Sequence, residues 1–140
     1  MGGNRSAMKR PYIKCPYCGS QAFLRPASVL GKTGPSYVGK EFYVCGRYPR
    51  CNSYVAAHTH SRLPMGTLAD PALRRKRHDA HLMFDRLWKE GYMTIDEAYR
   101  WLQTQLGLPE SEAHIGKFSD YRCNEVIRMC EQFLSGAGIA

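Results

Sequence analysis

Two close cysteine pairs in the N-terminal half limit most strongly how this chain can fold. The first is Cys15-Pro16-Tyr17-Cys18 and the second is Cys45-Gly46-Arg47-Tyr48-Pro49-Arg50-Cys51, with 26 residues between them. A tight turn places two thiolates at neighbouring corners of a tetrahedron, so two such turns supply the four ligands of a structural zinc ion. Gly19 and Gly46 permit the positive φ angles that turn backbone amides toward sulfur. We therefore predict one structural Zn²⁺ held by Cys15, Cys18, Cys45 and Cys51.

Disulfides and redox chemistry are the alternative uses of such cysteines. Disulfides need an oxidising compartment. The stretch from Met1 to Lys14 contains basic side chains but no continuous apolar core, so we expect no export signal and a cytoplasmic location. No apolar run approaches the roughly 20 residues that span a bilayer. A redox-active CxxC expects a strand followed by a helix. Turn residues and then a strand pattern follow Cys15 instead, which favours zinc.

The charge of the chain is concentrated in its first half. Lys and Arg number 20 and Asp and Glu number 12, a net charge of +8. Residues 1–69 carry ten basic side chains and a single acid, Glu41, whereas residues 70–140 carry ten basic and eleven acidic side chains. A one-sided basic field is typical of a protein with an anionic partner, most often nucleic acid. A basic surface that only confers solubility remains the alternative.

The pattern around the cysteines is typical of strands. Aromatic and β-branched residues fill 22–25, 41–44 and 53–57, and a turn-rich loop separates the first two stretches. Two hairpin-like arms, each carrying one cysteine pair, describe a zinc ribbon over 13–60. We expect a basic arm over 1–12 before it and a linker over 61–69 after it. With four cysteines present, His58 and His60 are not needed as ligands.

The second half predicts helices. Asp70-Pro71 is a helix start, and that helix extends to Lys89-Glu90. Thr94-Ile95-Asp96-Glu97 is a capping box that opens a helix over 95–106. Ser119 caps a third helix over 120–134. The expected fold class is α+β, with a small β ribbon packed against or linked to a three-helix domain over 70–140.

The ribbon segment resembles known zinc proteins. Cys15-Pro16-Tyr17-Cys18-Gly19-Ser20, an aromatic strand and the Tyr-Pro of the second knuckle are similar to the C-terminal zinc ribbons of type IA DNA topoisomerases. This resemblance implies binding of single-stranded DNA. The loop between the arms is longer here, and the remaining chain cannot hold a topoisomerase core, so strand passage is not implied.

The whole chain also resembles the zinc-finger-containing domain family of small bacterial and phage proteins. The two knuckles, the stretches 63–70 and 80–88, the segment 114–118 and Cys123 carry this resemblance. It implies zinc and a phage or prophage setting, in the cytoplasm of the host cell. It does not imply a biochemical activity.

Basic and aromatic side chains alternate around the knuckles, which is the usual chemistry of single-strand binding. We predict nucleic-acid contacts at Lys14, Tyr17, Arg25, Lys40, Arg47, Tyr48, Arg50 and Arg62. We assign the rings of Phe23, Phe42 and Tyr54 instead to the small core of the ribbon.

The leading hypothesis is a zinc-ribbon protein that binds single-stranded DNA or RNA. The alternative is a module that binds a host or phage protein, with Trp88, Tyr92, Tyr99 and Trp101 available for an interface. No catalytic motif is found, so we expect no enzyme. A metal-dependent nuclease that uses a helix face with His78, His81 and Asp85 is the third hypothesis. Cys123 and Cys130 are predicted to be buried free thiols.

Overall fold

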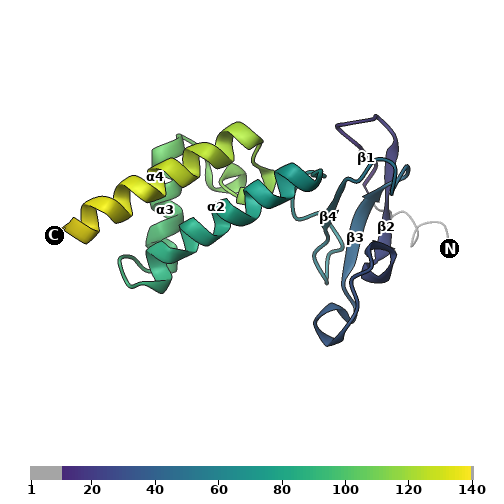
Figure 1. Cartoon of the computed structure of the whole chain (residues 1–140), viewed down its shortest axis with the longest axis horizontal. Coiled ribbons are helices and arrows are strands. Elements are labelled where there is room, and N and C mark those ends of the chain that lie inside the picture. The colour runs from purple at the N-terminus through teal and green to yellow at the C-terminus, as the bar shows by residue number, and fades with distance from the viewer. Residues whose placement is uncertain (1–10, 140) are drawn as a thin grey trace. The chain divides into compact units, whose positions relative to one another are not determined.

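A computed structural model describes residues 11–139, with side chains through residue 136, and divides the chain into two compact units. The ribbon unit ends at Asp70 and the helical unit begins at Pro71 (Figure 1). Strands lie in the first unit and three α-helices in the second, which confirms the α+β prediction. The first ten residues of the expected basic arm lie outside the described residues.

The ribbon unit is a four-stranded antiparallel meander in the order β1-β2-β3-β4. The long β2–β3 connection contains two 3₁₀ turns, η1 (Ala27–Leu30) and η2 (Pro35–Tyr37). Each strand pairs with its neighbour in sequence, so the two cysteine turns are at the ends of adjacent strands. The strands are β1 (Ile13–Lys14), β2 (Gln21–Pro26), β3 (Glu41–Cys45) and β4 (Tyr54–Ala56).

Strand register sorts the side chains onto two faces of this sheet. Ala22 pairs with Cys45 and Leu24 with Tyr43, and residues opposite each other in an antiparallel pair share a face. This core face, completed by Cys15, Ala57 and Leu68, is buried. The opposite side of the sheet is the outer face, defined by the alternate positions Phe23, Arg25, Phe42, Val44, Tyr54 and Ala56.

The expectation that Phe23 lies in the ribbon core is wrong. Its ring is 46% exposed on the outer face, because the two-residue alternation of β2 turns Ala22 and Leu24 inward. Phe42 and Tyr54 are half-buried on the same outer face and meet edge to face, with ring centroids 5.8 Å apart. These rings therefore cover the outer side of the sheet and leave its buried side to other residues.

The segment 61–69, expected to be a linker, is packed onto the ribbon instead. Tyr54 and Ala69 exchange two backbone hydrogen bonds of 3.2 and 3.1 Å, and Ala57 forms a bridge with Pro64. Leu68 and Ala69 are each only 1% exposed. Burial of these apolar side chains beside β4 and pairing of its edge hold the segment in place.

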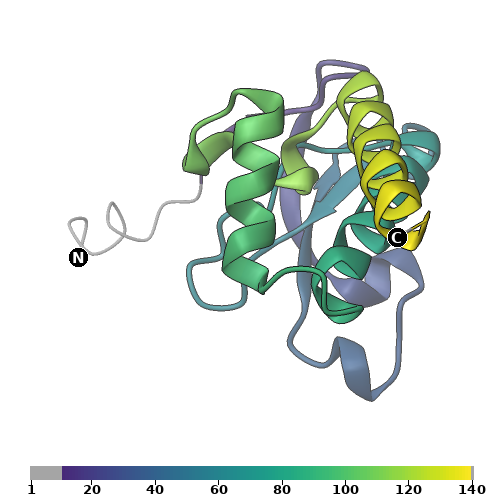
Figure 2. The ribbon, with the colours of Figure 1, turned by 90° about the vertical axis from the view of Figure 1, so that its left-hand side faces the viewer.

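The helical unit contains α2 (Pro71–Lys89), α3 (Ile95–Leu106) and α4 (Asp120–Ile139). Two short 3₁₀ turns, η3 (Glu110–Glu112) and η4 (Ile115–Lys117), connect α3 to α4. Helices α2 and α4 lie side by side and run in the same direction (Figure 1), and α3 stands beside them (Figure 2). Their apolar sides enclose a core that includes Phe84, Leu102 and Val126.

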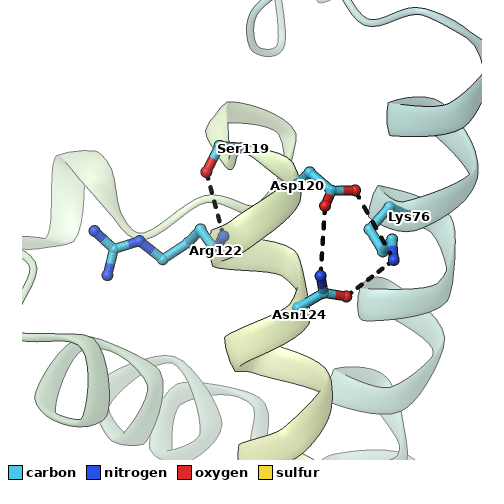
Figure 3. A network of polar contacts seen from close by, with 5 residues as sticks. All are labelled: Lys76, Ser119, Asp120, Arg122 and Asn124. Carbon is cyan, nitrogen blue, oxygen red and sulfur yellow. Dashed lines mark hydrogen bonds and ion pairs between the residues drawn. The ribbon is translucent and has the colours of Figure 1, made fainter.

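Polar contacts hold the start of α4 against α2 (Figure 3). The Ser119 hydroxyl accepts a 3.2 Å hydrogen bond from the backbone N–H of Arg122, as the predicted cap requires. Lys76 of α2 donates a 3.0 Å hydrogen bond to Asn124 and lies 3.8 Å from the Asp120 carboxylate. Lys76 thus has two partners inside the helical unit. Among residues 11–139, no helix is long and apolar enough to cross a membrane.

Candidate metal centre and basic surface

Four cysteine side chains meet at one end of the ribbon. The sulfur atoms of Cys15, Cys18, Cys45 and Cys51 all lie within 4.8 Å of one another. The Sγ–Sγ distance is 3.7 Å between Cys15 and Cys51 and 3.4 Å between Cys18 and Cys45. A tetrahedral zinc with 2.3 Å bonds places neighbouring sulfur atoms about 3.8 Å apart. All four are free thiols, so the cluster fits one zinc ion as predicted.

Backbone hydrogen bonds form the two cysteine turns. In the first turn the N–H of Cys15 donates to Ser20 O at 2.7 Å, and the N–H of Gly19 donates to Cys15 O at 2.9 Å. Gly19 has φ +81°, the left-handed conformation that glycine permits. In the second turn the Arg47 N–H donates to the sulfur of Cys45 at 3.4 Å. An N–H aimed at sulfur stabilises the thiolate that zinc requires.

Gly46 is needed for a different reason from the one predicted. It is not among the residues with positive φ. A Cβ at this position would lie 2.8 Å from the carbonyl oxygen of Gln21 and 3.1 Å from the Phe23 ring. The Gly46 N–H donates to that same carbonyl at 2.9 Å. The absent side chain therefore allows the second turn to approach β2, and β2 continues from the first turn.

The four thiols ionise unequally. Hydrogen bonds from Ser20 lower the pKa of Cys18 to about 6. Burial raises the pKa of Cys15, but the backbone N–H groups of Cys18 and Tyr17 outweigh it, so its pKa is lowered. Burial and the neighbouring thiols raise the pKa of Cys51 to about 12, and burial raises that of Cys45. Without a cation only part of the cluster is ionised, whereas Zn²⁺ compensates the charge of four thiolates.

The remaining candidate ligands are not assembled. Within residues 11–139, the four cysteines are the only group of three or more Cys, His, Asp or Glu side chains placed to hold a metal. His78 and His81 are exposed, and Asp85 lies 3.9 Å from Lys89 in an ion pair. His58 and His60 are exposed and outside the cysteine cluster. Four thiolates leave no open position on the metal, so this zinc is structural.

Cys123 and Cys130 lie in the core of the helical unit. Both are free and 0% exposed, which confirms the prediction of buried thiols. Burial raises the pKa of Cys123, and it raises that of Cys130 to about 12. They act as small apolar side chains of the core.

Five of the eight predicted nucleic-acid contacts lie beside the outer face or on the second cysteine turn. Arg25 is on this face itself, and Lys14 extends the same side because it pairs with Gln21. The Tyr48 ring meets Tyr54 edge to face at 6.3 Å. Arg47 and Arg50 are exposed on the second cysteine turn.

The other three lie elsewhere. The Tyr17 hydroxyl accepts a 3.1 Å hydrogen bond from the backbone N–H of Asp70. Arg62 pairs with Glu41 at 3.5 Å, and Glu41 occupies a core-face position of β3. Lys40 is exposed just before β3. The predicted set is therefore spread over both sides of the sheet.

The residues that sequence reasoning missed on the outer face are Phe23 and Lys32. The Nζ of Lys32 lies 5.7 Å from the Tyr37 ring centroid and 5.8 Å from that of Tyr54. Ala22, Phe23 and Leu24 are all apolar, so the sequence did not indicate which face of the strand Phe23 occupies. Nothing in the sequence indicated that the long loop folds back to bring Lys32 to Tyr54.

Of three comparisons with known proteins, the one with family models gave a match. Searches of curated proteins and of solved structures found no match to this chain. A family model described as a zinc-finger-containing domain matches residues 11–133, which includes all four clustered cysteines and extends through most of α4. The chain therefore belongs to the family of the zinc-finger-containing domain.

Proposed function

We propose that the ribbon unit binds single-stranded nucleic acid across the outer face of its sheet. The observation that carries this proposal is the combination of rings and cations on that face. Phe23, Phe42 and Tyr54 occupy three neighbouring strands, with Arg25 opposite Phe42 and Lys32 beside Tyr54. Stacking rings beside basic side chains are the usual means of holding an extended strand.

The rings supply the contact with bases. Phe23 is 46% exposed, and Tyr54 is half-buried with contacts to both Phe42 and Tyr48. A ring held by its neighbours loses little conformational freedom when a base stacks on it. Such stacking is worth about 1–3 kcal/mol for each base and tolerates different sequences. The face is therefore suited to binding with little sequence preference.

The cations supply the contact with phosphate groups. Lys14 and Arg25 are exposed on this side of the sheet, and Lys32 lies beside it. Glu41 is the single acid of residues 1–69, and it pairs with Arg62 on the other side. The basic side chains of the outer face thus have no acidic neighbour on the sheet. Their field attracts a phosphate backbone.

Single strands suit this face better than duplexes. The bases of a duplex are stacked inside it, so flat rings on a sheet cannot reach their faces. Unpaired bases can lie on Phe23 and Tyr54 while the phosphates follow the cations.

Substitutions on the outer face test this proposal. We expect Phe23→Ala to weaken binding of a fluorescent single-stranded oligonucleotide about 5- to 100-fold, because one stacked base loses its ring. Phe23→Ala should change the free energy of unfolding only slightly, because the Phe23 ring is 46% exposed. Arg25→Gln weakens binding through the loss of one phosphate contact. Anisotropy titrations of the zinc-loaded variants measure both effects.

Tyr121→Ala is the matched control, since this ring is 69% exposed in the helical unit. It should leave the affinity unchanged. Wild-type affinity in Phe23→Ala and Arg25→Gln, with zinc content intact, would contradict the proposal.

The protein-interaction alternative has less support. It relied on aromatic residues of the helical unit, and three of these rings contact other rings of that unit, although Tyr92 is also 43% exposed. Tyr92 and Trp101 both meet Phe133 edge to face, with centroids 5.9 and 5.8 Å apart. Tyr99 meets Phe84 in the same way at 5.0 Å. These ring contacts are made within the helical unit, so they do not by themselves indicate an interface with another protein.

A further inference from the structure

A hollow of about 500 Å³ lies in the ribbon unit beside the end of β2. The 3₁₀ turns η1 and η2, the loop between them and the start of β3 form its walls, with Arg62 closing one side. This volume falls within the range of small-molecule sites, about 300–1,000 Å³. The metal centre does not use these residues, and none of them is on the outer face, although Lys32 lies beside it.

Positive charge dominates the lining of this hollow. Lys32, Lys40 and Arg62 are its basic side chains, and Glu41 is its single acid. Glu41 pairs with Arg62, which leaves two ammonium groups without a carboxylate partner among residues 11–139. Three cations and one carboxylate give a local charge of about +2 at neutral pH. A phosphate monoester, with a charge of about −1.5 to −2 at pH 7, matches this charge better than a singly charged phosphodiester does.

Backbone donors and an aromatic ring complete the lining. The N–H groups of Thr33, Gly34 and Gly39 donate no hydrogen bond to any group in the described part of the chain. Such N–H groups are good donors to phosphate oxygens. The half-buried Tyr37 ring stands in the same wall, below the Lys32 ammonium. A nucleotide offers the phosphate for the cations and N–H groups and a base for the ring.

Lys32 joins the hollow to the outer face. Its ammonium lies 5.7 Å from Tyr37, which lines the hollow, and 5.8 Å from Tyr54 on the outer face. We propose that this hollow binds the phosphorylated terminal nucleotide of the strand that lies on the outer face. This inference deepens the proposed function and rests on it. The protein then binds a phosphorylated strand end more tightly than the interior of a strand.

The test compares three single-stranded oligonucleotides of one sequence at low salt. One carries a 5′-phosphate, one a 3′-phosphate, and one hydroxyl groups at both ends. We expect one phosphorylated form to bind the wild-type protein about fivefold more tightly than the hydroxyl form, as one to two additional charge contacts would give. Equal affinity for all three would overturn the inference while leaving the proposed function in place.

Two lysine variants test whether the preference for a phosphorylated strand end arises in the hollow. Lys40→Gln should abolish the preference for the phosphorylated end and leave affinity for the hydroxyl form unchanged. Its side chain is exposed, so the variant keeps the fold. Lys14→Gln, the same change on the outer face, should weaken all three oligonucleotides and retain the preference. A preference that survives in Lys40→Gln would overturn the assignment to this hollow.

If the oligonucleotide with hydroxyl groups at both ends does not bind, the proposed function is contradicted. A separate measurement then tests whether the hollow binds a nucleotide. Thymidine 5′-monophosphate is titrated into isotope-labelled protein, and the backbone amide signals of residues 31–40 are followed by NMR. Shifts confined to these residues, and larger than those with inorganic phosphate, support a nucleotide site. No shifts, or equal shifts with inorganic phosphate, overturn it.

Discussion

Single thiols in the zinc cluster differ widely in how readily they ionise. The pKa of Cys18 is lowered to about 6 and that of Cys51 is raised to about 12. In the metal-free protein at neutral pH, Cys45 and Cys51 therefore keep their protons, and zinc has to displace both. Proton release couples metal affinity to pH.

Zinc affinity should fall as the pH is lowered. Release of at least these two protons makes the apparent affinity fall at least about 100-fold for each pH unit below neutrality. Below about pH 6, Cys18 also takes up a proton and the dependence becomes steeper. Competition with a chromophoric chelator between pH 5.5 and 8 measures the slope. An affinity that is constant over this range would contradict the thiol assignment.

Cys130 should resist alkylation in the folded protein. With a pKa of about 12, about one molecule in ten thousand carries its thiolate at pH 8, and the side chain is 0% exposed. Mass spectrometry after treatment with iodoacetamide should find Cys123 and Cys130 unmodified in the native protein and modified in guanidinium. Equal labelling rates in the two states would show that the helical core is open.

Among the elements, the helices were the most predictable. Asp70-Pro71 and the Thr94–Glu97 capping box mark helix starts through local hydrogen bonds, and the structure begins α2 and α3 at Pro71 and Ile95. The end of α4 was less predictable, since it extends to Ile139 where residue 134 was expected. The sequence has no proline or other local stop signal at residue 134. The first glycines after that residue are at 136 and 138.

The two turns and the metal position of the ribbon could be predicted from the sequence. The face of the sheet on which each side chain lies could not. Cysteine spacing indicated the two turns and the position of the metal. The side on which Phe23 lies depends on the strand register, which long-range pairing sets. The packing of Leu68 and Ala69 beside β4 also depends on contacts distant in sequence. Local patterns carry little information about such contacts, so the linker and ring assignments failed together.

Gly46→Ala should weaken the metal centre. The new Cβ would approach the carbonyl oxygen of Gln21 to 2.8 Å, so the second turn must move away from β2. Overpacking of this kind costs about 1–3 kcal/mol of unfolding free energy. Thermal unfolding and zinc competition should both show the loss. Gly136→Ala, with open space around it in α4, is the control and should keep the wild-type zinc affinity and lose no thermal stability. A wild-type Gly46→Ala protein would contradict the close-approach explanation.

The ribbon unit and the helical unit have cores of different size. In the described part of the ribbon unit the core consists of six buried residues, and two of these are the zinc ligands Cys15 and Cys45. The helical core consists of eleven buried residues and needs no metal. A small core of this kind depends on its metal for folding.

Removal of zinc should therefore unfold the ribbon and leave the helices. We expect a strong chelator to abolish the dispersed NMR signals of residues 41–57 while the helical circular dichroism signal remains near its starting value. Readdition of zinc restores the ribbon signals. Loss of both units together, or retention of both, would contradict the assignment of separate cores.

Binding of single-stranded nucleic acid to the outer face can be measured in a salt series. Affinity for a labelled single-stranded oligonucleotide and for the matching duplex is measured from about 20 to 200 mM salt. We predict tighter binding of the single strand. About three phosphate contacts give a slope of log affinity against log salt of about −2, and Arg25→Gln reduces its magnitude by about 0.7. Equal or tighter duplex binding, or no binding at the lowest salt, would contradict the account.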